Sequence, residues 1–201
     1  MSQNTQIKLS PQQLNKNRQD FLDILQNTQR LPLPKQFYCF LDSGDFWTAP
    51  ASTRFHDSHE GGLVVHSLKV YEHLTILNYQ QMLGFSEDSI AKTALFHDIC
   101  KINFYKKSYR NKRLEDGRWI RMESYDIDDE LPLGHGEKSV AILLAHQVPL
   151  TQEEMLAIRW HMGGFDASAR DYAAGMALSS AMSKSKLVTA LHLADMMATW
   201  L

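Results

Sequence analysis

The stretch SIAKTALFHDICK, residues 89–101, decides the fold and the chemistry expected of this chain. Its first eight residues are mostly apolar, as in a helix packed inside a protein. The helix pattern carries His97 and Asp98 toward the core, where an imidazole and a carboxylate are natural ligands for a divalent cation. Lys101 follows them at helical spacing, where it can contact phosphate.

Composition sets broad limits on the class of protein. The chain has 201 residues, 44% hydrophobic and 22% charged, enough for one domain with a substantial core. The net charge of -2 indicates no overall basic field, although local clusters can still bind phosphate. Cys39 and Cys100 lie too far apart in sequence to indicate a disulfide framework or a zinc-thiolate motif. The polar N-terminus lacks a secretory core and residues 140–145 are too few to span a bilayer, so we expect a soluble, cytoplasmic protein without membrane contact.

Helical patterns extend through most of the chain. Ser10 and Pro11 predict the start of a Gln-rich helix, residues 10–30 approximately, that packs on the rest. Further helices are predicted by apolar spacing and by capping residues, including the Thr151 and Glu154 capping box; they cover residues 37–41, 63–83, 86–101, 138–146, 151–161 and 186–201. We therefore expect a single all-α domain over residues 1–201.

One segment departs from the helical pattern. Between Tyr105 and Asp126 the apolar periodicity fades, and Asp116-Gly117 is a two-residue turn signal. Residues 118–125 alternate in polarity. The sequence predicts a small β-hairpin around residues 108–125, inserted in the helical domain.

Asp195 is a second candidate ligand, because it lies in a segment that is apolar on nearly every face. A buried carboxylate without a partner costs several kcal/mol. The compensating group can be a helix cap, an ion pair, a hydrogen bond from His192 one turn earlier, or a metal cation. Spacing alone leaves these alternatives open.

Five short motifs together carry a family resemblance. They are EGGLVVHSL at 60–68, ALFHDICK at 94–101, GHG at 134–136, IRWH at 158–161 and LAD at 193–195. In order and residue type the chain resembles the HD-domain metal-dependent phosphohydrolase superfamily over residues 54–201, and is most similar to the HD domain of bacterial 3′-to-5′ exoribonucleases. Cys100 stands where that family commonly has glycine, a small change that we expect to leave the ligands unaffected.

The resemblance implies an all-α HD-domain bundle with a metal centre. His66, His97, Asp98 and Asp195 would hold one divalent ion, and His135 and His161 a second ion, with Asp98 shared. An alternative is that His135 and His161 only bind phosphate or line the pocket. The implied cofactors are one or two ions of Mn, Fe, Co, Ni, Zn or Mg. The implied reaction is attack of metal-bound hydroxide on phosphorus, with Asp98 and Lys101 as catalytic residues.

The hairpin bears on the substrate. Cations are interleaved there with aromatic rings, a combination that attracts phosphates and stacks bases; the residues are Lys101, Lys106, Lys107, Arg110, Lys112, Arg113, Arg118 and Arg121, with Tyr105, Tyr109 and Trp119. Lys106 and Lys107 lie closest to the metal motif, and by resemblance Arg54 and His56 also face the pocket. Equally, the hairpin can be an ordinary solvated surface, with the following acidic run paired to its cations.

Three functions fit these patterns. The leading hypothesis is a phosphohydrolase that cleaves a phosphoester of a nucleotide or similar small phosphorylated substrate. The second is a nuclease or phosphodiesterase specific for single-stranded nucleic acid. The third is a non-catalytic, metal-stabilised regulatory or interaction module. The sequence leaves the oligomeric state open.

Overall fold

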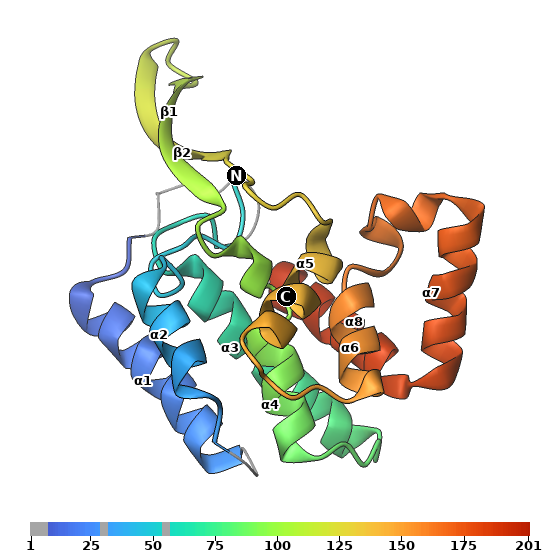
Figure 1. The fold of residues 1–201 in the computed structure, drawn as a ribbon. Helices are drawn as coiled ribbons and strands as arrows, with labels where there is room; N and C mark the ends of the chain where they lie inside the picture. The colour runs from blue at the N-terminus through green and yellow to red at the C-terminus, as the bar shows by residue number, and fades with distance from the viewer. Residues whose placement is uncertain (1–7, 29–31, 54–56) are drawn as a thin grey trace.

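The computed structural model describes residues 8–28, 32–53 and 57–201, which form a helical domain with one projecting hairpin (Figure 1). The helices are α1 (Pro11–Thr28), α2 (Lys35–Ser43), α3 (Gly62–Gln80), α4 (Glu87–Phe96), α5 (His135–Ala145), α6 (Gln152–Trp160), α7 (Tyr172–Lys184) and α8 (Lys186–Trp200). Short 3-10 turns cover Ile99–Lys101, Gly163–Phe165 and Ser168–Arg170. This confirms the expectation of a mostly helical fold. Within the described ranges, no helix has both the length and the apolar character needed to cross a membrane.

The predicted hairpin is present and slightly longer than expected. Strand β1 (Tyr105–Arg113) pairs antiparallel with β2 (Trp119–Ile127), and the register places Tyr105 opposite Ile127. The turn between the strands contains Gly117, whose φ of +85° is a conformation that glycine adopts without strain. In Figure 1 the two strands rise away from the helices. The hairpin therefore interrupts the domain between α4 and α5, as the sequence indicates.

Two hydrophobic clusters hold the helices together. In the first, the Phe96 ring packs edge-on against Phe21 of α1 and Phe37 of α2, with ring centroids 5.7 and 5.0 Å apart. The second joins α3, α6 and α8 through fully buried residues such as Leu74 and Leu191. Each cluster removes large apolar side chains from water, and burial of one such side chain stabilises the fold by about 1.5–3 kcal/mol. Phe96 belongs to the first cluster and is followed directly by His97, so the packing of α4 fixes where the candidate ligands lie.

The helix boundaries show which sequence signals were reliable. In the predicted capping box, the Thr151 hydroxyl accepts from the Glu154 amide and the Glu154 carboxylate accepts from the Thr151 amide. Ser86 caps α4 by accepting from the Ser89 amide. The predicted helix over residues 86–101 is wrong in its last turn: α4 ends at Phe96, and His97 and Asp98 lie in a tight turn before the 3-10 turn that ends at Lys101.

Helix α7 was not predicted from the sequence. Ala174, Leu178, Ala181 and Met182 recur at helical spacing and pack on the second hydrophobic cluster. Serines and Gly175, which are weak helix formers, interrupt this stripe in the sequence. For the predicted N-terminal helix, α1 covers Pro11–Thr28, while residues 29–31 lie outside the described ranges. Ser10 caps it by accepting from the Gln13 amide.

Candidate metal centre

The structure brings all six predicted metal ligands into one buried cluster around Asp98. Five separate segments contribute them: His66 from α3, His97 and Asp98 from the turn after α4, His135 from the first residue of α5, His161 from the end of α6, and Asp195 from α8. His66, His97 and His161 are fully buried, and Asp98 is nearly so. Residues that are far apart in sequence therefore meet where five helices come together.

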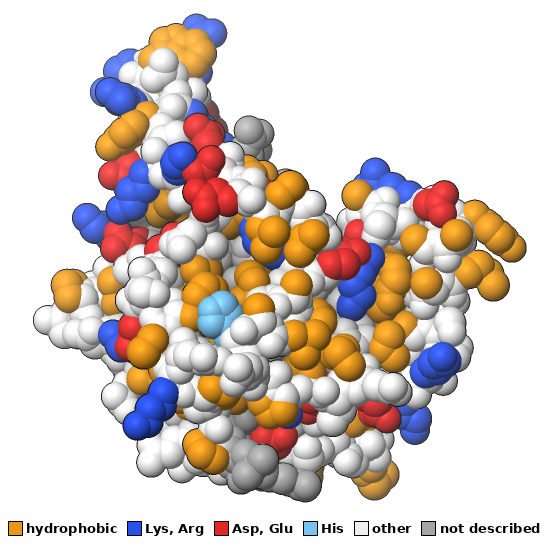
Figure 2. All heavy atoms as spheres, in the orientation of Figure 1, with side chains coloured by type: hydrophobic (Ala, Val, Ile, Leu, Met, Phe, Trp, Pro, Cys, Tyr) orange, Lys and Arg blue, Asp and Glu red, His pale blue; other side chains and the backbone are white. Residues whose placement is uncertain are grey.

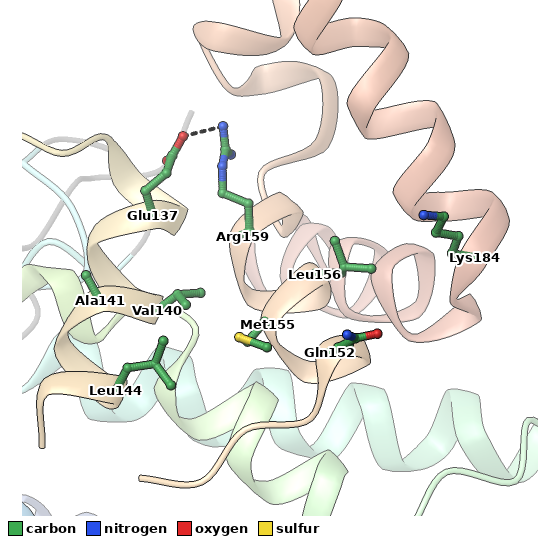
Figure 3. A pocket seen from close by; sticks show the side chains of 9 residues that line it. All are labelled: Glu137, Val140, Ala141, Leu144, Gln152, Met155, Leu156, Arg159 and Lys184. Atoms are coloured by element: carbon green, nitrogen blue, oxygen red, sulfur yellow. Dashed lines mark ion pairs between the residues drawn. The ribbon is translucent and has the colours of Figure 1, made fainter. Parts of the chain in front are cut away.

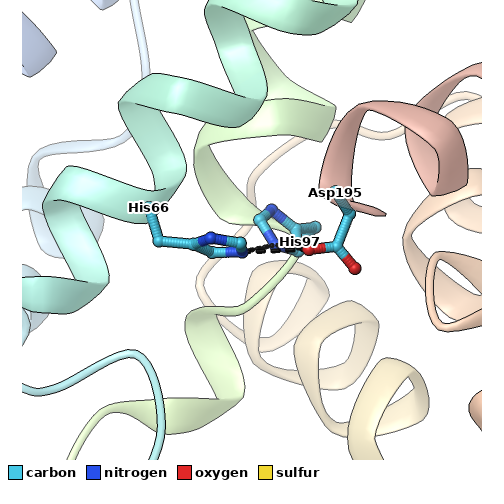
Figure 4. Close-up of side chains that lie close together, drawn as sticks. All are labelled: His66, His97 and Asp195. Carbon is cyan, nitrogen blue, oxygen red and sulfur yellow. Dashed lines mark hydrogen bonds and ion pairs between the residues drawn. The ribbon is translucent and has the colours of Figure 1, made fainter. Parts of the chain in front are cut away.

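One half of the cluster joins α3, α4 and α8. The Nε2 atoms of His66 and His97 lie 3.3 Å apart. Asp195 Oδ1 lies 3.0 Å from His66 Nε2 and 3.9 Å from His97 Nε2 (Figure 4). Asp98 faces the same two rings through Oδ2, at 3.8 and 3.5 Å. The partner of Asp195 is thus His66, and not His192 as one sequence alternative suggested.

The other half of the cluster uses the second oxygen of Asp98. Asp98 Oδ1 lies 2.6 Å from His135 Nε2 and 3.5 Å from His161 Nε2. The two carboxylate oxygens of Asp98 therefore face two different pairs of histidines. This is the arrangement required of a carboxylate that is shared between two halves of one site.

Hydrogen bonds at Nδ1 orient three of the histidine rings. His97 Nδ1 lies 2.8 Å from the carbonyl oxygen of Ala94, and His161 Nδ1 lies 2.7 Å from that of Ile158. A carbonyl only accepts, so Nδ1 carries the hydrogen in both rings and a neutral ring presents a lone pair at Nε2. His135 Nδ1 faces the Cys100 sulfur at 3.4 Å. Such bonds at the far nitrogen are the usual support for histidines that bind metals.

The protonation states favour a cation. Burial raises the pKa of Asp98, but Lys101, His97 and His135 outweigh it and hold the pKa well below its usual range. Burial also raises the pKa of Asp195, but His66 and His97 outweigh burial and lower it. Burial lowers the pKa of both His66 and His135. At neutral pH the cluster therefore combines two ionised carboxylates with neutral imidazoles at His66 and His135.

The donor atoms fit a divalent ion. His161 Nε2 is buried and has no hydrogen-bond partner among the described residues, although it points at an Asp98 oxygen. A lone pair that faces a carboxylate is repelled unless a cation or a proton lies between them. Burial alone would lower the pKa of His97, but the negative charges of Asp98 and Asp195 outweigh burial and raise it. Nitrogen and carboxylate oxygen are the ligands that first-row divalent ions accept.

Backbone packing accounts for the meeting of His135 and His161. A Cβ atom on Gly136 would lie 2.1 Å from the carbonyl oxygen of Arg159, so only glycine allows α5 to approach α6 this closely. Gly136 directly follows His135, and Arg159 precedes His161 by two positions. The close approach of the two backbones therefore sets the spacing of the two histidines.

The predicted phosphate contacts lie at different places. Lys101 is buried and its Nζ donates to Asp98 Oδ2 at 2.5 Å; the charge of Asp98 outweighs burial and raises the lysine pKa. Lys106 and Lys107 are exposed on the hairpin, where Lys106 pairs with Asp128 and Lys107 with Glu60. Asp128 belongs to the acidic residues that follow the hairpin, and their pairing with the hairpin cations was one of the alternatives that the sequence left open. Arg54 and His56 lie outside the described residues.

Two contacts beside the cluster were not predicted from the sequence. Cys100, which we expected to leave the ligands unaffected, contacts His135 and forms a group with His135 and Asp98 that could hold a metal ion. Burial raises the pKa of the Cys100 thiol to about 12. His192 Nδ1 lies 2.6 Å from the carbonyl oxygen of His161 and so ties α8 to the end of α6. Neither contact follows from residue spacing.

A separate cavity of about 640 Å³ lies between α5 and α6, beside the end of α7. Its lining is mainly apolar, with an ion pair between Glu137 and Arg159 at one end (Figure 3). None of the six candidate ligands lines it.

Comparison of the chain with protein-family models, with curated proteins and with solved structures found no match.

Proposed function

We propose that this protein is a metal-dependent phosphohydrolase of the HD-domain type, which cleaves a phosphoester of a nucleotide or similar small phosphorylated substrate. One observation carries the proposal: Asp98 directs its two oxygens to two histidine pairs, and one of those histidines, His161, has a buried Nε2 without a hydrogen-bond partner among the described residues. A divalent ion held between this nitrogen and Asp98 would give it a partner.

The residues have distinct roles in this proposal. His66, His97, Asp98 and Asp195 would hold one divalent ion, and His135 and His161 would hold a second ion together with Asp98. Ions bound there supply Lewis acidity toward phosphoryl oxygens and lower the pKa of bound water.

Lys101 would act on the phosphoryl group. It keeps its proton because its pKa is raised beside Asp98, and its ammonium group contacts that carboxylate directly. A fixed positive charge in a buried site stabilises the negative charge that develops on phosphoryl oxygens during hydrolysis. Replacing Lys101 with methionine should therefore lower kcat more than it raises KM.

The first test is metal content followed by turnover. Purified protein is analysed for bound metal, stripped with a chelator, and reloaded separately with Mn, Fe, Co, Ni, Zn or Mg. Hydrolysis is then measured with p-nitrophenyl phosphate, bis-p-nitrophenyl phosphate and a nucleotide panel. At least one ion should support turnover, and His97→Ala and Asp98→Ala should each reduce it at least about a hundredfold.

A matched control comes from the same helix as one ligand. His73 lies on α3 with His66 but takes no part in the cluster, so His73→Ala should retain metal and activity. Bound metal without turnover on any substrate would overturn the hydrolase and leave the metal-stabilised module. Absence of metal binding, with the fold intact, would overturn both.

A further inference from the structure

The register of the hairpin separates its side chains by chemistry. Directly paired residues of an antiparallel ladder point to the same face, and successive residues of a strand point to opposite faces. One face, here called the aromatic face, consists of Tyr105, Lys107, Tyr109, Asn111 and Arg113 on β1 and Trp119, Arg121, Glu123, Tyr125 and Ile127 on β2. All the aromatic residues of the two strands lie on this face.

The aromatic face presents both rings and cations to solvent. Trp119 is 67% exposed and Tyr109 is 57% exposed, values that are high for large apolar side chains in a folded protein. The Arg121 guanidinium lies 4.1 Å from the centroid of the Tyr109 ring, and Arg113 stands opposite Trp119. In Figure 2 the projecting hairpin carries blue Lys and Arg side chains along its length and an apolar group near its tip.

The base of this face adjoins the candidate metal centre. Tyr105, four positions after Lys101, is its first residue; burial raises the pKa of the Tyr105 hydroxyl to about 12, and the charge of Lys101 opposes this shift. Lys107 contacts Glu60, which precedes the helix that carries His66. The aromatic face therefore forms a path along the hairpin, from its base beside the cluster to its tip. Strand β1 has nine residues, so the path is about 30 Å long, far more than one nucleotide needs.

We propose that the aromatic face binds single-stranded nucleic acid and leads it toward the metal centre. Exposed rings interleaved with arginines match a ligand that offers flat bases and phosphates in alternation. A duplex hides its base faces, and a free nucleotide would use only a fraction of the path. Binding stands on the hairpin alone, whereas the polymer's role as substrate rests on the proposed hydrolase function.

Binding is tested on the full chain without turnover. Fluorescence anisotropy follows a labelled single strand of about 15 nucleotides, near the upper end of known single-strand site sizes, in EDTA and over a range of salt concentrations. The intact protein should bind it with a Kd that rises with salt and should bind the matching duplex more weakly. Because EDTA prevents metal-dependent cleavage, binding is measured even if the protein hydrolyses nothing.

Variants of the two faces provide matched pairs. Trp119 and Ile120 are neighbours on opposite faces, so Trp119→Ala should weaken binding at least about fivefold, the lower end of one base stack, and Ile120→Ala less than about twofold. Arg113→Gln with Arg121→Gln removes two cations from the aromatic face, and Arg110→Gln with Lys112→Gln removes two from the other. The first pair should reduce the slope of log Kd against log salt by about 1.4, and the second by much less.

Several outcomes would overturn the proposal. They are no salt-dependent binding by folded protein, equal losses in the two double variants, equal losses for Trp119→Ala and Ile120→Ala, or equal affinity for duplex. Thermal unfolding of each variant verifies the fold. If the strand is bound as expected while no metal supports hydrolysis of any substrate, the proposed function fails and the binding face stands.

Discussion

Replacing Gly136 with alanine should move His135 away from His161 in the half of the cluster that they share. The new Cβ would lie 2.1 Å from the Arg159 carbonyl oxygen and 2.6 Å from its carbon, whereas such contacts are essentially never below 3.0 Å. The atoms in the way are backbone, so no side chain can rotate to relieve the contact. Helix α5 must therefore move from α6 by about 1 Å, a shift typical of an overpacked core.

The magnitude follows from two opposing effects. Overpacking costs about 1–3 kcal/mol, and the restricted unfolded state of alanine returns about 0.4–1 kcal/mol. The free energy of unfolding should thus fall by about 1–2 kcal/mol, which lowers the urea midpoint by about 0.5–1 M at an m-value near 2 kcal/mol/M. Because His135 moves with Gly136, the affinity for Mn²⁺ should also fall by about tenfold, as for lost support of a ligand.

Gly164→Ala is the control, measured by the same urea titration and by calorimetry with Mn²⁺. A Cβ there meets no atom within 4 Å, so stability should be unchanged or slightly higher. If Gly136→Ala unfolds at the parental urea concentration and binds Mn²⁺ with parental affinity, contact between α5 and α6 does not set the spacing of His135 and His161.

Three further predictions concern metal, cysteine and pH. A divalent ion at 100 times its dissociation constant should add about 2.7 kcal/mol and raise Tm by about 5–10 °C in differential scanning fluorimetry, and His97→Ala should remove this effect. Cys100→Ala should lower metal affinity about tenfold by freeing the His135 ring, whereas Cys100→Ser keeps an acceptor and most of the affinity. Burial raises the pKa of Asp57, but His59 and Lys69 outweigh it and hold the pKa at about 2. Its stabilising effect is complete above about pH 4 and lost as the pH falls toward 2, so the stability difference from Asp57→Asn should shrink in urea titrations below pH 4.

The helices with a clear apolar stripe and the hairpin with its Asp116-Gly117 turn could be predicted from the sequence, because local patterns determine them. Helix α7 was missed although it carries an apolar stripe, because serines and Gly175, which are weak helix formers, interrupt it. The six candidate ligands were found by residue type and order. The family resemblance also grouped Asp195 with His66 and His97. Residue spacing alone left the partner of Asp195 open, because the contact with His66 depends on the packing of α3 on α8.

At the ends of α4 and α6, one hydrogen bond both terminates the helix and orients a candidate ligand. His97 and His161 each follow the last residue of a helix, α4 or α6. The last four carbonyls of a helix have no amide partner within it, so they need another donor. In both cases Nδ1–H of the histidine bonds to the carbonyl three residues earlier, which satisfies the helix end and turns Nε2 toward Asp98. Extending either helix by one turn would remove the free carbonyl, so the boundaries after Phe96 and Trp160 are needed for the centre itself.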